Sequence, residues 1–593
     1  MTTPLRYGAI FLASAGLVVG LWFVLERGPA SVGHAPPKPP GKLVVLIVFD
    51  QMRGDYLARW SGQFGDNGFE RMKKNGVWCS DVRIPYACTS TGPSHASIIT
   101  GAPPSVHGIV ENDWYDRASG SRVYCAQPLR PYERVPPAPK GAPARGSDIG
   151  FAPDRLLAET VGDKLLAANE KSRVVSLSIK DRTAVLLGGK KPTAAYCFDS
   201  RDGVFHTGSY YRPAVHSWVE EFNASGRVND WLGKDWTRFK PDLDYEKLSG
   251  PDNGAGEATG VDDLATFNQK RTFPHPFPTK PIMQARPKLY YASVEMSPAG
   301  NDLLLDLAKK AIVAEKLGDG EAADLLCLSF SSNDLIGHAW GPDSQEALDI
   351  TLRSDALIAD LLAYLDEKLP ERYSLVVTSD HGVCPLPEQK RIEGAARKSV
   401  RDLLPQLALA LDEAYGVPPG GPTRWFELED RDNSDLFPWL YLNRKAIEAR
   451  KLKVATVADF AAQWIGNRPF MFTAFTRGHI ESGTLPLGGN AEEKKALLDR
   501  VKLAYHPERC GDVIAIPKPG VLVTGYPEGT SHGSPHRYDT HVPVVAFGRG
   551  VPSSGKVDAV KSSLIVAPTL AALLGVEPPS SAREKAAFDV VEK

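Results

Sequence analysis

Aspartate and histidine residues follow several apolar runs of the chain, where they could bind metal ions. Asp50 ends the run LVVLIVFD, Asp380 and His381 end YSLVVTSDH, and SSNDLIGH, directly after DLLCLSF, carries Asp334 and His338. A single aspartate after a strand is usually a helix cap or a turn residue. Repetition at successive strand ends instead predicts ligation by carboxylate and imidazole, which suits zinc and similar divalent ions.

The third histidine ligand comes from the late segment SHGSPHRYDTH, which offers His532, His536 and His541. With three aspartates and three histidines the chain has enough ligands for two metal ions, roughly 4 Å apart. Such a pair clamps the attacking and leaving oxygens of an in-line displacement at phosphorus.

A nucleophile for this reaction is expected in YACTSTGPSHASIITG, where Thr91 stands just before a predicted helix. A bound metal would lower the pKa of its hydroxyl, and the N–H groups of the helix N-terminus would attract a phosphate. The alternative is that Thr91 is only a helix cap. We expect His95 to pack or to hydrogen-bond behind the site, because the ligand count is complete without it.

Two cations, Lys180 and Arg182, stand two residues apart in SIKDRTAV. On a strand or an extended loop they would point to one face and converge on one spot. A phosphate monoester has nearly two negative charges and three terminal oxygens, so converging cations favour a monoester over a diester. The alternative is that both pair with surface carboxylates.

Five apolar, β-branched runs predict strands buried on both faces, as in a parallel sheet. They are residues 43–50, 173–179, 324–330, 373–380 and 541–548. Helical stretches lie between them, such as 154–171 and 344–369. The alternation predicts an α/β fold with a doubly wound, mostly parallel sheet sandwiched by helices. The alternation of strands and helices is interrupted at residues 200–290 and 385–520. We expect these two segments to be cap-like insertions over one edge of the sheet.

The N-terminus carries an uncharged apolar run that ends at Leu25, after the single positive charge Arg6. It is just long enough to cross a bilayer, so we expect residues 1–27 to be a signal anchor, with a cleaved signal peptide as the alternative. Residues 28–42 form a Pro-rich tether, and 43–575 the catalytic domain. The charge pattern predicts an exported protein, periplasmic in a bacterium and anchored to the inner membrane, or secreted if cleaved.

Composition excludes several classes of protein. The 593 residues carry a formal net charge of −2, which gives no support for nucleic-acid binding. The seven cysteines include no CxxC pair, so neither a zinc ribbon nor a dense disulfide scaffold is indicated. An odd count leaves at least one thiol unpaired, and one or two disulfides remain open. No obligate protein partner is inferred.

The ordered set of motifs resembles the alkaline phosphatase superfamily, in its branch of nucleotide pyrophosphatases/phosphodiesterases and single-threonine alkaline phosphatases. The matching pieces are VVLIVFDQMRGDYL, TSTGPSHASIITG, SVHGIVENDWYD, SSNDLIGHAWGP, VVTSDHG and SHGSPHRYDTHVP. The resemblance implies two Zn²⁺ ions. One would be held by Asp50, Thr91, Asp380 and His381, and the other by Asp334, His338 and His532. His532 is preferred to His536 and His541 because glycine follows it, as in the family.

The resemblance also implies an activity. Thr91 would attack phosphorus and form a covalent phospho-threonine, Asn112 would hydrogen-bond a phosphate oxygen, and Lys180 with Arg182 would favour small-molecule phosphate monoesters. The alternative is a phosphodiesterase or nucleotide pyrophosphatase on the same fold. A sulfatase is disfavoured because CTSTGP lacks the C/S-x-P-x-R motif, and a non-catalytic binding protein because the ligand set is intact. Cys197 and GGKKPTAAYCFD depart from the family pattern.

Overall fold

The computed structural model describes residues 41–139, 150–428 and 436–588. The predicted signal anchor, residues 1–27, and nearly all of the tether lie outside the described residues. Within the described ranges, no helix is both long enough and apolar enough to cross a membrane.

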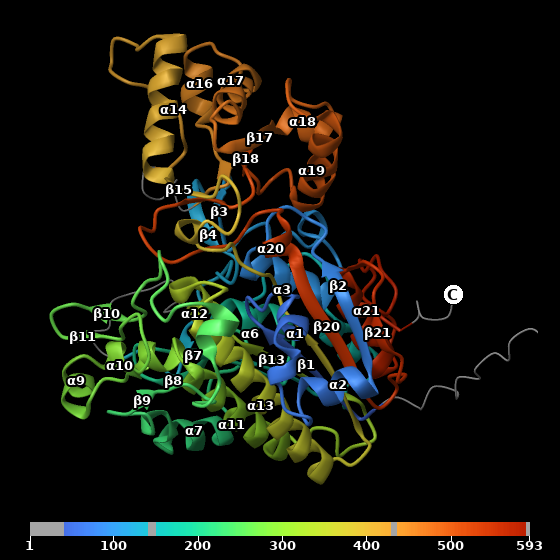
Figure 1. The fold of residues 1–593 in the computed structure, drawn as a ribbon. Helices are drawn as coiled ribbons and strands as arrows, with labels where there is room; N and C mark the ends of the chain where they lie inside the picture. Colours follow the sequence, from blue (N-terminus) through green and yellow to red (C-terminus); the bar gives the residue numbers. More distant parts are fainter. Residues whose placement is uncertain (1–40, 140–149, 429–435, 589–593) are drawn as a thin grey trace, which may run out of the picture. The chain divides into compact units, whose positions relative to one another are not determined.

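An 11-stranded sheet forms the centre of the fold (Figure 1). Five neighbouring strands pair in parallel. In sheet order they are β14 (Tyr373–Thr378), β1 (Leu43–Phe49), β13 (Asp324–Phe330), β6 (Val174–Ser178) and β7 (Ala194–Asp199). Four of the five come from runs predicted as buried strands, and the mostly parallel sheet with its covering helices confirms the predicted fold class.

The fifth predicted run, β20 (His541–Gly548), does not run parallel to its neighbours. It pairs antiparallel with β14 on one side and with β2 (Val77–Arg83) on the other. Burial on both faces produced the apolar run, and seven of its eight residues are buried. An apolar run indicates that a strand is buried on both faces, but it does not indicate the direction of the strand. The prediction of a parallel strand was therefore wrong for β20.

The two faces of the sheet are covered by two separate hydrophobic cores. Along β1, Leu43, Val45 and Ile47 belong to one core, and the alternate residues Val44 and Leu46 belong to the other. Helices α11 (Pro298–Ala314) and α13 (Gln345–Lys368) cover the first face, while α3 (Thr91–Thr100), α5 (Val161–Ala168) and α21 (Val566–Leu574) cover the second. A strand covered on both sides reads as a continuous apolar run.

The predicted helix at 344–369 agrees with α13, whereas the one at 154–171 shortens to α5. Thr160 begins α5 through a reciprocal capping box with Asp163. The stretch before Thr160 is not helical, because this cap sets the first turn.

Residues 200–290 are only partly an insertion. They begin with β8 (Val204–Gly208), which joins the main sheet antiparallel to β7. Aromatic residues of this region, including Trp218, Trp236 and Tyr245, belong to the core on the α13 side. The region therefore extends the sheet and thickens one face.

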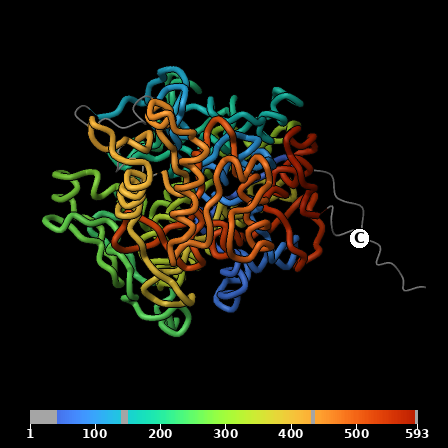
Figure 2. Tube along the Cα trace, turned by 90° about the horizontal axis from the view of Figure 1, so that it is seen from above, coloured from blue at the N-terminus to red at the C-terminus, as the bar shows by residue number. Residues whose placement is uncertain are grey.

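Residues 396–428 and 436–524 form a lobe, coloured from yellow to orange in Figures 1 and 2. Its three-stranded sheet has the order β16 (Trp439–Leu440), β18 (Val513–Pro517), β17 (Met471–Thr476). The remaining elements are β15 (Ala396–Ser399), α14 (Val400–Tyr415), α16 (Arg444–Ala449), α17 (Val454–Gly466), α18 (Arg477–Ser482), α19 (Ala491–Ala504) and β19 (Val521–Thr524). The lobe has its own core between α14, α17 and the small sheet.

The seven cysteines are all buried and all free. The structure therefore forms none of the disulfides that the sequence left open.

Candidate functional site

The first group of candidate ligands, called the inner group, consists of Asp50, Asp380 and His381. Val48 of β1 is in register with Thr378 of β14, so the next residues of both strands leave the sheet at the same edge. The three side chains are completely buried, and one potential ligand atom of each lies within 4.8 Å of those of the others. The strand-end rule for α/β sheets thus places this group correctly.

The second group, called the outer group, consists of Asp334, His338 and His532. Asp334 and His338 lie one turn apart on α12 (Ser332–Trp340), which follows β13. His338 Nε2 is 3.2 Å and His532 Nε2 is 3.6 Å from Asp334 Oδ1. His338 keeps 31% of its side chain exposed, so this group opens toward solvent.

The two groups are in contact through His381. Its ring stacks on that of His532 with centroids 3.5 Å apart, and ligand atoms of Asp334, His381 and His532 also lie within 4.8 Å of one another. The six aspartate and histidine side chains predicted as ligands are therefore brought together. His536 and His541 are not among them, because their Nε2 atoms contact the backbone oxygens of Pro517 and Ser80.

Backbone carbonyl groups orient the histidines. The Nδ1 atoms of His338, His381 and His532 contact the carbonyl oxygens of Thr530 (2.7 Å), Gly382 (3.0 Å) and Thr89 (2.8 Å). An imidazole held through Nδ1 presents Nε2 to the site, which is the usual arrangement of histidines that bind a metal.

His95 lies behind the inner group, fully buried on α3. Its Nδ1 is 2.9 Å from the Thr91 carbonyl oxygen and 3.3 Å from Asp380 Oδ2, and its Nε2 is 3.0 Å from Ser329 Oγ. This agrees with the expected packing and hydrogen-bonding role.

Charges at the site are strongly unbalanced. Burial, together with the charges of Asp334 and Asp380, holds the pKa of Asp50 well above its ordinary value. Burial also acts to raise the pKa of Asp334, but the nearby His338 and Lys180 hold it well below its ordinary value. Three buried carboxylates close enough to affect one another's pKa need positive charge beside them.

The inner group fits a metal ion by the chemistry of its donors and by its unpaired atoms. Asp50 Oδ1 and Asp380 Oδ2 are buried without a hydrogen-bond partner, and both lie within 4 Å of His381 Nε2. Buried polar atoms rarely lack partners, and mixed oxygen and nitrogen donors suit a divalent cation.

Thr91 is the first residue of α3, next to both groups and 1% exposed. Its Oγ1 is 3.4 Å from His381 Nε2 and 3.5 Å from an Arg182 Nη2. Ser90, not Thr91, occupies the cap position, and it makes no side-chain capping bond. The hydroxyl of Thr91 is therefore directed at the site rather than used as a helix cap.

The local structure predicted for Lys180 and Arg182 was wrong. Lys180 is the N-cap residue of α6 (Asp181–Gly188), and Arg182 lies inside its first turn. Lys180 Nζ donates to Asp50 Oδ2 at 2.7 Å and to Asp334 Oδ2 at 2.5 Å, so it pairs with the ligand carboxylates rather than with surface ones. The two cations reach the same site, but from a turn and a helix start instead of one face of an extended segment.

Arg182 is held in place by residues that the sequence did not single out. Its Nη1 donates to Tyr124 Oη at 3.4 Å, and Tyr124 Oη donates to Asp181 Oδ1 at 2.5 Å. Neither motif nor spacing connects Tyr124 to Arg182, because the two lie on different elements.

Asn112 closes the start of α3. Its Oδ1 accepts a hydrogen bond from the Gly92 N–H at 2.7 Å, which leaves its NH₂ group as the donor for other partners. That backbone N–H is therefore already used, contrary to our expectation of free N–H groups for a phosphate. Beside it, burial raises the pKa of Glu111 to about 7, and Ser90 Oγ donates to Glu111 at 2.5 Å.

A cavity of about 750 Å³ opens over these residues. Its lining includes five of the candidate site residues: Thr91, Asn112, Arg182, His338 and His532. The lobe supplies a mostly apolar wall, which includes Val400, Ile516, Val521 and Leu522 together with Leu436 and Phe437. The site thus lies between the carboxyl ends of the strands and the lobe.

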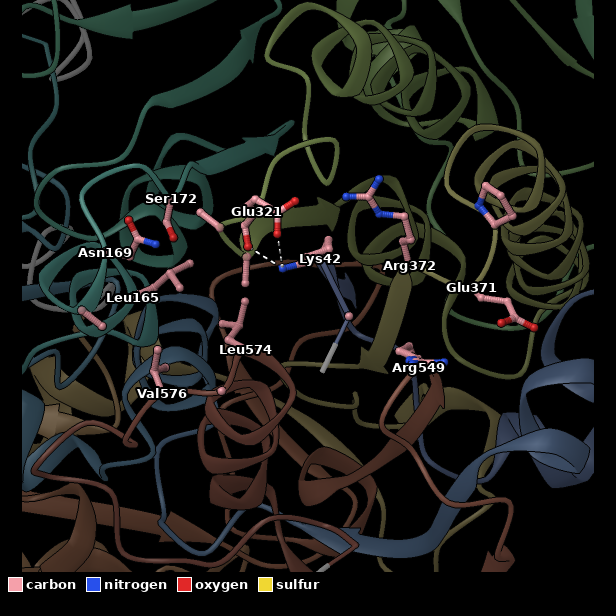
Figure 3. A pocket seen from close by; sticks show the side chains of 16 residues that line it. Lys42, Leu165, Asn169, Ser172, Glu321, Glu371, Arg372, Arg549, Leu574 and Val576 are labelled. Carbon is pink, nitrogen blue, oxygen red and sulfur yellow. Dashed lines mark hydrogen bonds and ion pairs between the residues drawn. The ribbon is translucent and has the colours of Figure 1, made fainter. Parts of the chain in front are cut away.

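A second cavity, of about 760 Å³, lies at the opposite ends of the strands, beside the starts of β1 and β13 (Figure 3). Lys42 there bonds to Glu321, and Arg372 donates to the carbonyl oxygens of Asp319 and Gly320. The candidate metal-binding groups of the described residues all lie at the other edge of the sheet. The first cavity is therefore the one that adjoins the candidate ligands.

Three comparisons with known proteins agree on one relationship. Residues 44–541 match the family described as type I phosphodiesterase / nucleotide pyrophosphatase. The chain is 31% identical over 583 residues to alkaline phosphatase PafA of Elizabethkingia meningoseptica, covering 97% of this chain and 98% of the relative. It is also 31% identical over 556 residues to alkaline phosphatase PhoV of Synechococcus elongatus, covering 93% of each chain. The crystal structure of wild-type PafA matches with a TM-score of 0.81 at 30% identity, over 93% of this chain and 99% of the other.

Proposed function

The chain belongs to the type I phosphodiesterase / nucleotide pyrophosphatase family, and on that premise we propose that it is an alkaline phosphatase. It hydrolyses phosphate monoesters through a covalent phospho-threonine and releases inorganic phosphate. The observation that carries this proposal is the position of Thr91 Oγ1 in the cavity lining, within 3.5 Å of both His381 and Arg182.

Two Zn²⁺ ions are the proposed cofactors. One ion would be held by Thr91 and the inner group, Asp50, Asp380 and His381. The other would be held by the outer group, Asp334, His338 and His532. Divalent cations bound there would stabilise the negative charge that develops on the attacking and leaving oxygens.

The residues of the chain divide the remaining work. Thr91 Oγ1 loses its proton to water and forms a bond to phosphorus while the bond from phosphorus to the substrate alcohol oxygen breaks. That oxygen takes a proton from water and leaves as the alcohol. Arg182 and the NH₂ group of Asn112 donate hydrogen bonds to the phosphate oxygens, which holds the group in line for attack. Water then attacks phosphorus and gives up a proton, the bond to Thr91 breaks, Thr91 Oγ1 regains a proton, and phosphate leaves.

Lys180 has a different part from Arg182. Its ammonium group contacts two ligand carboxylates and is not part of the cavity lining, so it supports the monoester preference through the charge of the site. Arg182, which lines the cavity, is the cation that contacts substrate.

The first test measures the hydrolysis of p-nitrophenyl phosphate against bis-p-nitrophenyl phosphate with zinc supplied. We expect the monoester to be much the better substrate, and we expect Arg182→Ala to reduce monoester turnover on the order of 10²-fold while affecting the diester less. A faster diester reaction would favour the alternative, a phosphodiesterase, for which the wide apolar wall of the cavity offers room for a second organic group.

The second test concerns the nucleophile. Acid-quenched enzyme should carry phosphate on Thr91 by mass spectrometry, and Thr91→Ala should bind metal, keep its fold and lose this adduct. A phosphate found on another residue would refute the assignment.

The N-terminal segment supports an exported enzyme. We place residues 1–27 as a signal anchor and the body in the periplasm, on the charge pattern of the sequence alone. Cell fractionation of the full chain against one lacking residues 1–27 tests this, since only the full chain should sediment with membranes.

A further inference from the structure

Gln51, the residue directly after Asp50, has a backbone conformation that is rare for its type. Its φ is +69°, in the left-handed region, and its side chain is only 4% exposed. Residues with a Cβ atom seldom adopt this conformation, and they keep it where surrounding contacts determine it.

The contacts of Gln51 reach both groups of candidate ligands. Its backbone N–H donates to Asp380 Oδ1 at 3.0 Å, and its side-chain Nε2 donates to Asp334 Oδ1 at 2.6 Å. One residue thus fixes one carboxylate of the inner group and one of the outer group.

The neighbouring helix α12 leaves room for this side chain. A Cβ atom on Gly337 would lie 1.8 Å from Gln51 Oε1, far inside contact distance. Gly337 stands between Asp334 and His338 on the same helix. A larger residue there would push the amide of Gln51 away from Asp334.

From these contacts we propose that Gln51 is a positioning residue that fixes the Asp334 carboxylate for the outer metal ion. The inference rests on the proposed two-metal function. Gln51 is not part of the cavity lining, so it acts through Asp334 and not on the substrate.

Two variants separate the side chain from the backbone. Gln51→Gly keeps the backbone N–H to Asp380 and suits φ of +69°, but it loses the bond to Asp334. Gln51→Ala loses the same bond and keeps the unfavourable conformation. Both variants should weaken zinc binding at the outer site to the same extent. Without metal, Gln51→Ala should melt at a lower temperature than Gln51→Gly.

The experiment titrates metal-free enzyme with Zn²⁺ by calorimetry and follows bound zinc by competition with a chromogenic chelator. Wild type should show two sites, and the outer one is identified as the site lost in His338→Asn. In both Gln51 variants the outer site should weaken about 10–100-fold and the inner site should keep its affinity.

Gly337→Ala provides an independent test, because it should reproduce the metal loss while leaving Gln51 in the chain. Added to Gln51→Gly, it should have no further effect on zinc affinity. Gln345→Ala is the matched control, since Gln345 is also a buried amide but bonds to Arg238 and Gly250. It should leave both zinc affinities unchanged.

The outcomes separate the inference from the proposed function. Wild-type protein that fails to bind two zinc ions overturns the two-metal function and this inference with it. If Gln51→Gly binds zinc normally at both sites, or loses affinity equally at both, the positioning role of Gln51 is overturned and the two-metal function still stands.

Discussion

The inner and outer groups reach the same site by different means. The inner group is fixed by two adjacent parallel strands, β1 and β14, and its side chains are fully buried. The outer group comes from helix α12 and from His532 in a loop that follows the lobe, and His338 remains 31% exposed. Strand register thus positions one candidate metal site, and packing between distant segments positions the other.

The groups also differ in how their charges are balanced. Asp50 Oδ1 and Asp380 Oδ2 lack hydrogen-bond partners, whereas both oxygens of Asp334 have them, from Gln51 and Lys180. The inner group is therefore incomplete without a cation, while the outer group already has protein partners. We expect the inner ion to bind more tightly and to be more important for the chemistry.

The largest effect is expected from losing an inner ligand. Asp380→Asn should reduce phosphatase activity more than about 10³-fold even with excess zinc, because the ion beside the nucleophile is lost. His338→Asn should be recovered in part by excess zinc. Activity measured at increasing zinc concentration, with metal content by mass spectrometry, distinguishes the two variants. If excess zinc restored activity to Asp380→Asn, the inner group would not be the more important one.

Removal of Lys180 should reveal the cost of the unbalanced carboxylates. Lys180→Met leaves Asp50 and Asp334 without their cation, so the metal-free protein should lose about 3 kcal/mol of unfolding free energy. Zinc should restore most of this loss. Urea unfolding with and without zinc measures it, and an equal loss in both states would argue against a charge effect.

Chelation should remove the two ions in order. The outer ion, next to the exposed His338, should leave first, roughly tenfold faster than the inner one, in a two-phase release followed with a chromogenic chelator. A single phase would mean that the two groups behave as one site.

Two buried glutamates away from both groups, Glu257 and Glu346, sharpen the comparison, because they are not among the candidate metal-binding groups found in the described residues. Burial and the charge of Glu346 raise the pKa of Glu257 to about 8. An unfolded glutamate loses its proton near pH 4.5, so between about pH 4.5 and 8 the folded state binds more protons and its stability falls as pH rises. Glu257→Gln has no carboxyl group to titrate, so it should not show this loss of stability. Between pH 6 and pH 8 its free energy of unfolding should gain about 1–2 kcal/mol relative to wild type. Melting temperatures across this range test it, and parallel curves for the two proteins would contradict it.

Much of the inner group could be predicted from the sequence, because strand ends are visible in it. Asp50 and Asp380 end apolar runs, and parallel strands bring their carboxyl ends to one edge. His532 needed the family resemblance, since a loop histidine carries no periodic signal. The contact of Lys180 with Asp50 and Asp334 could not be foreseen, because it depends on where a turn directs a flexible side chain.

The same limit applies to the fold. The buried strands were recognised from their apolar residues, but the antiparallel direction of β20 was not, since direction leaves no trace in such a run. The positive φ of Gln51 was equally hidden, because glutamine gives no sign of a left-handed turn.

The position of β20 has a consequence for biosynthesis. This strand is formed by residues 541–548, yet it lies inside the sheet, between β2 and β14. During translation β2 and β14 cannot reach their final places in the sheet until residues 541–548 have emerged. The nascent chain therefore cannot complete the candidate metal site before His532 and β20 have been made.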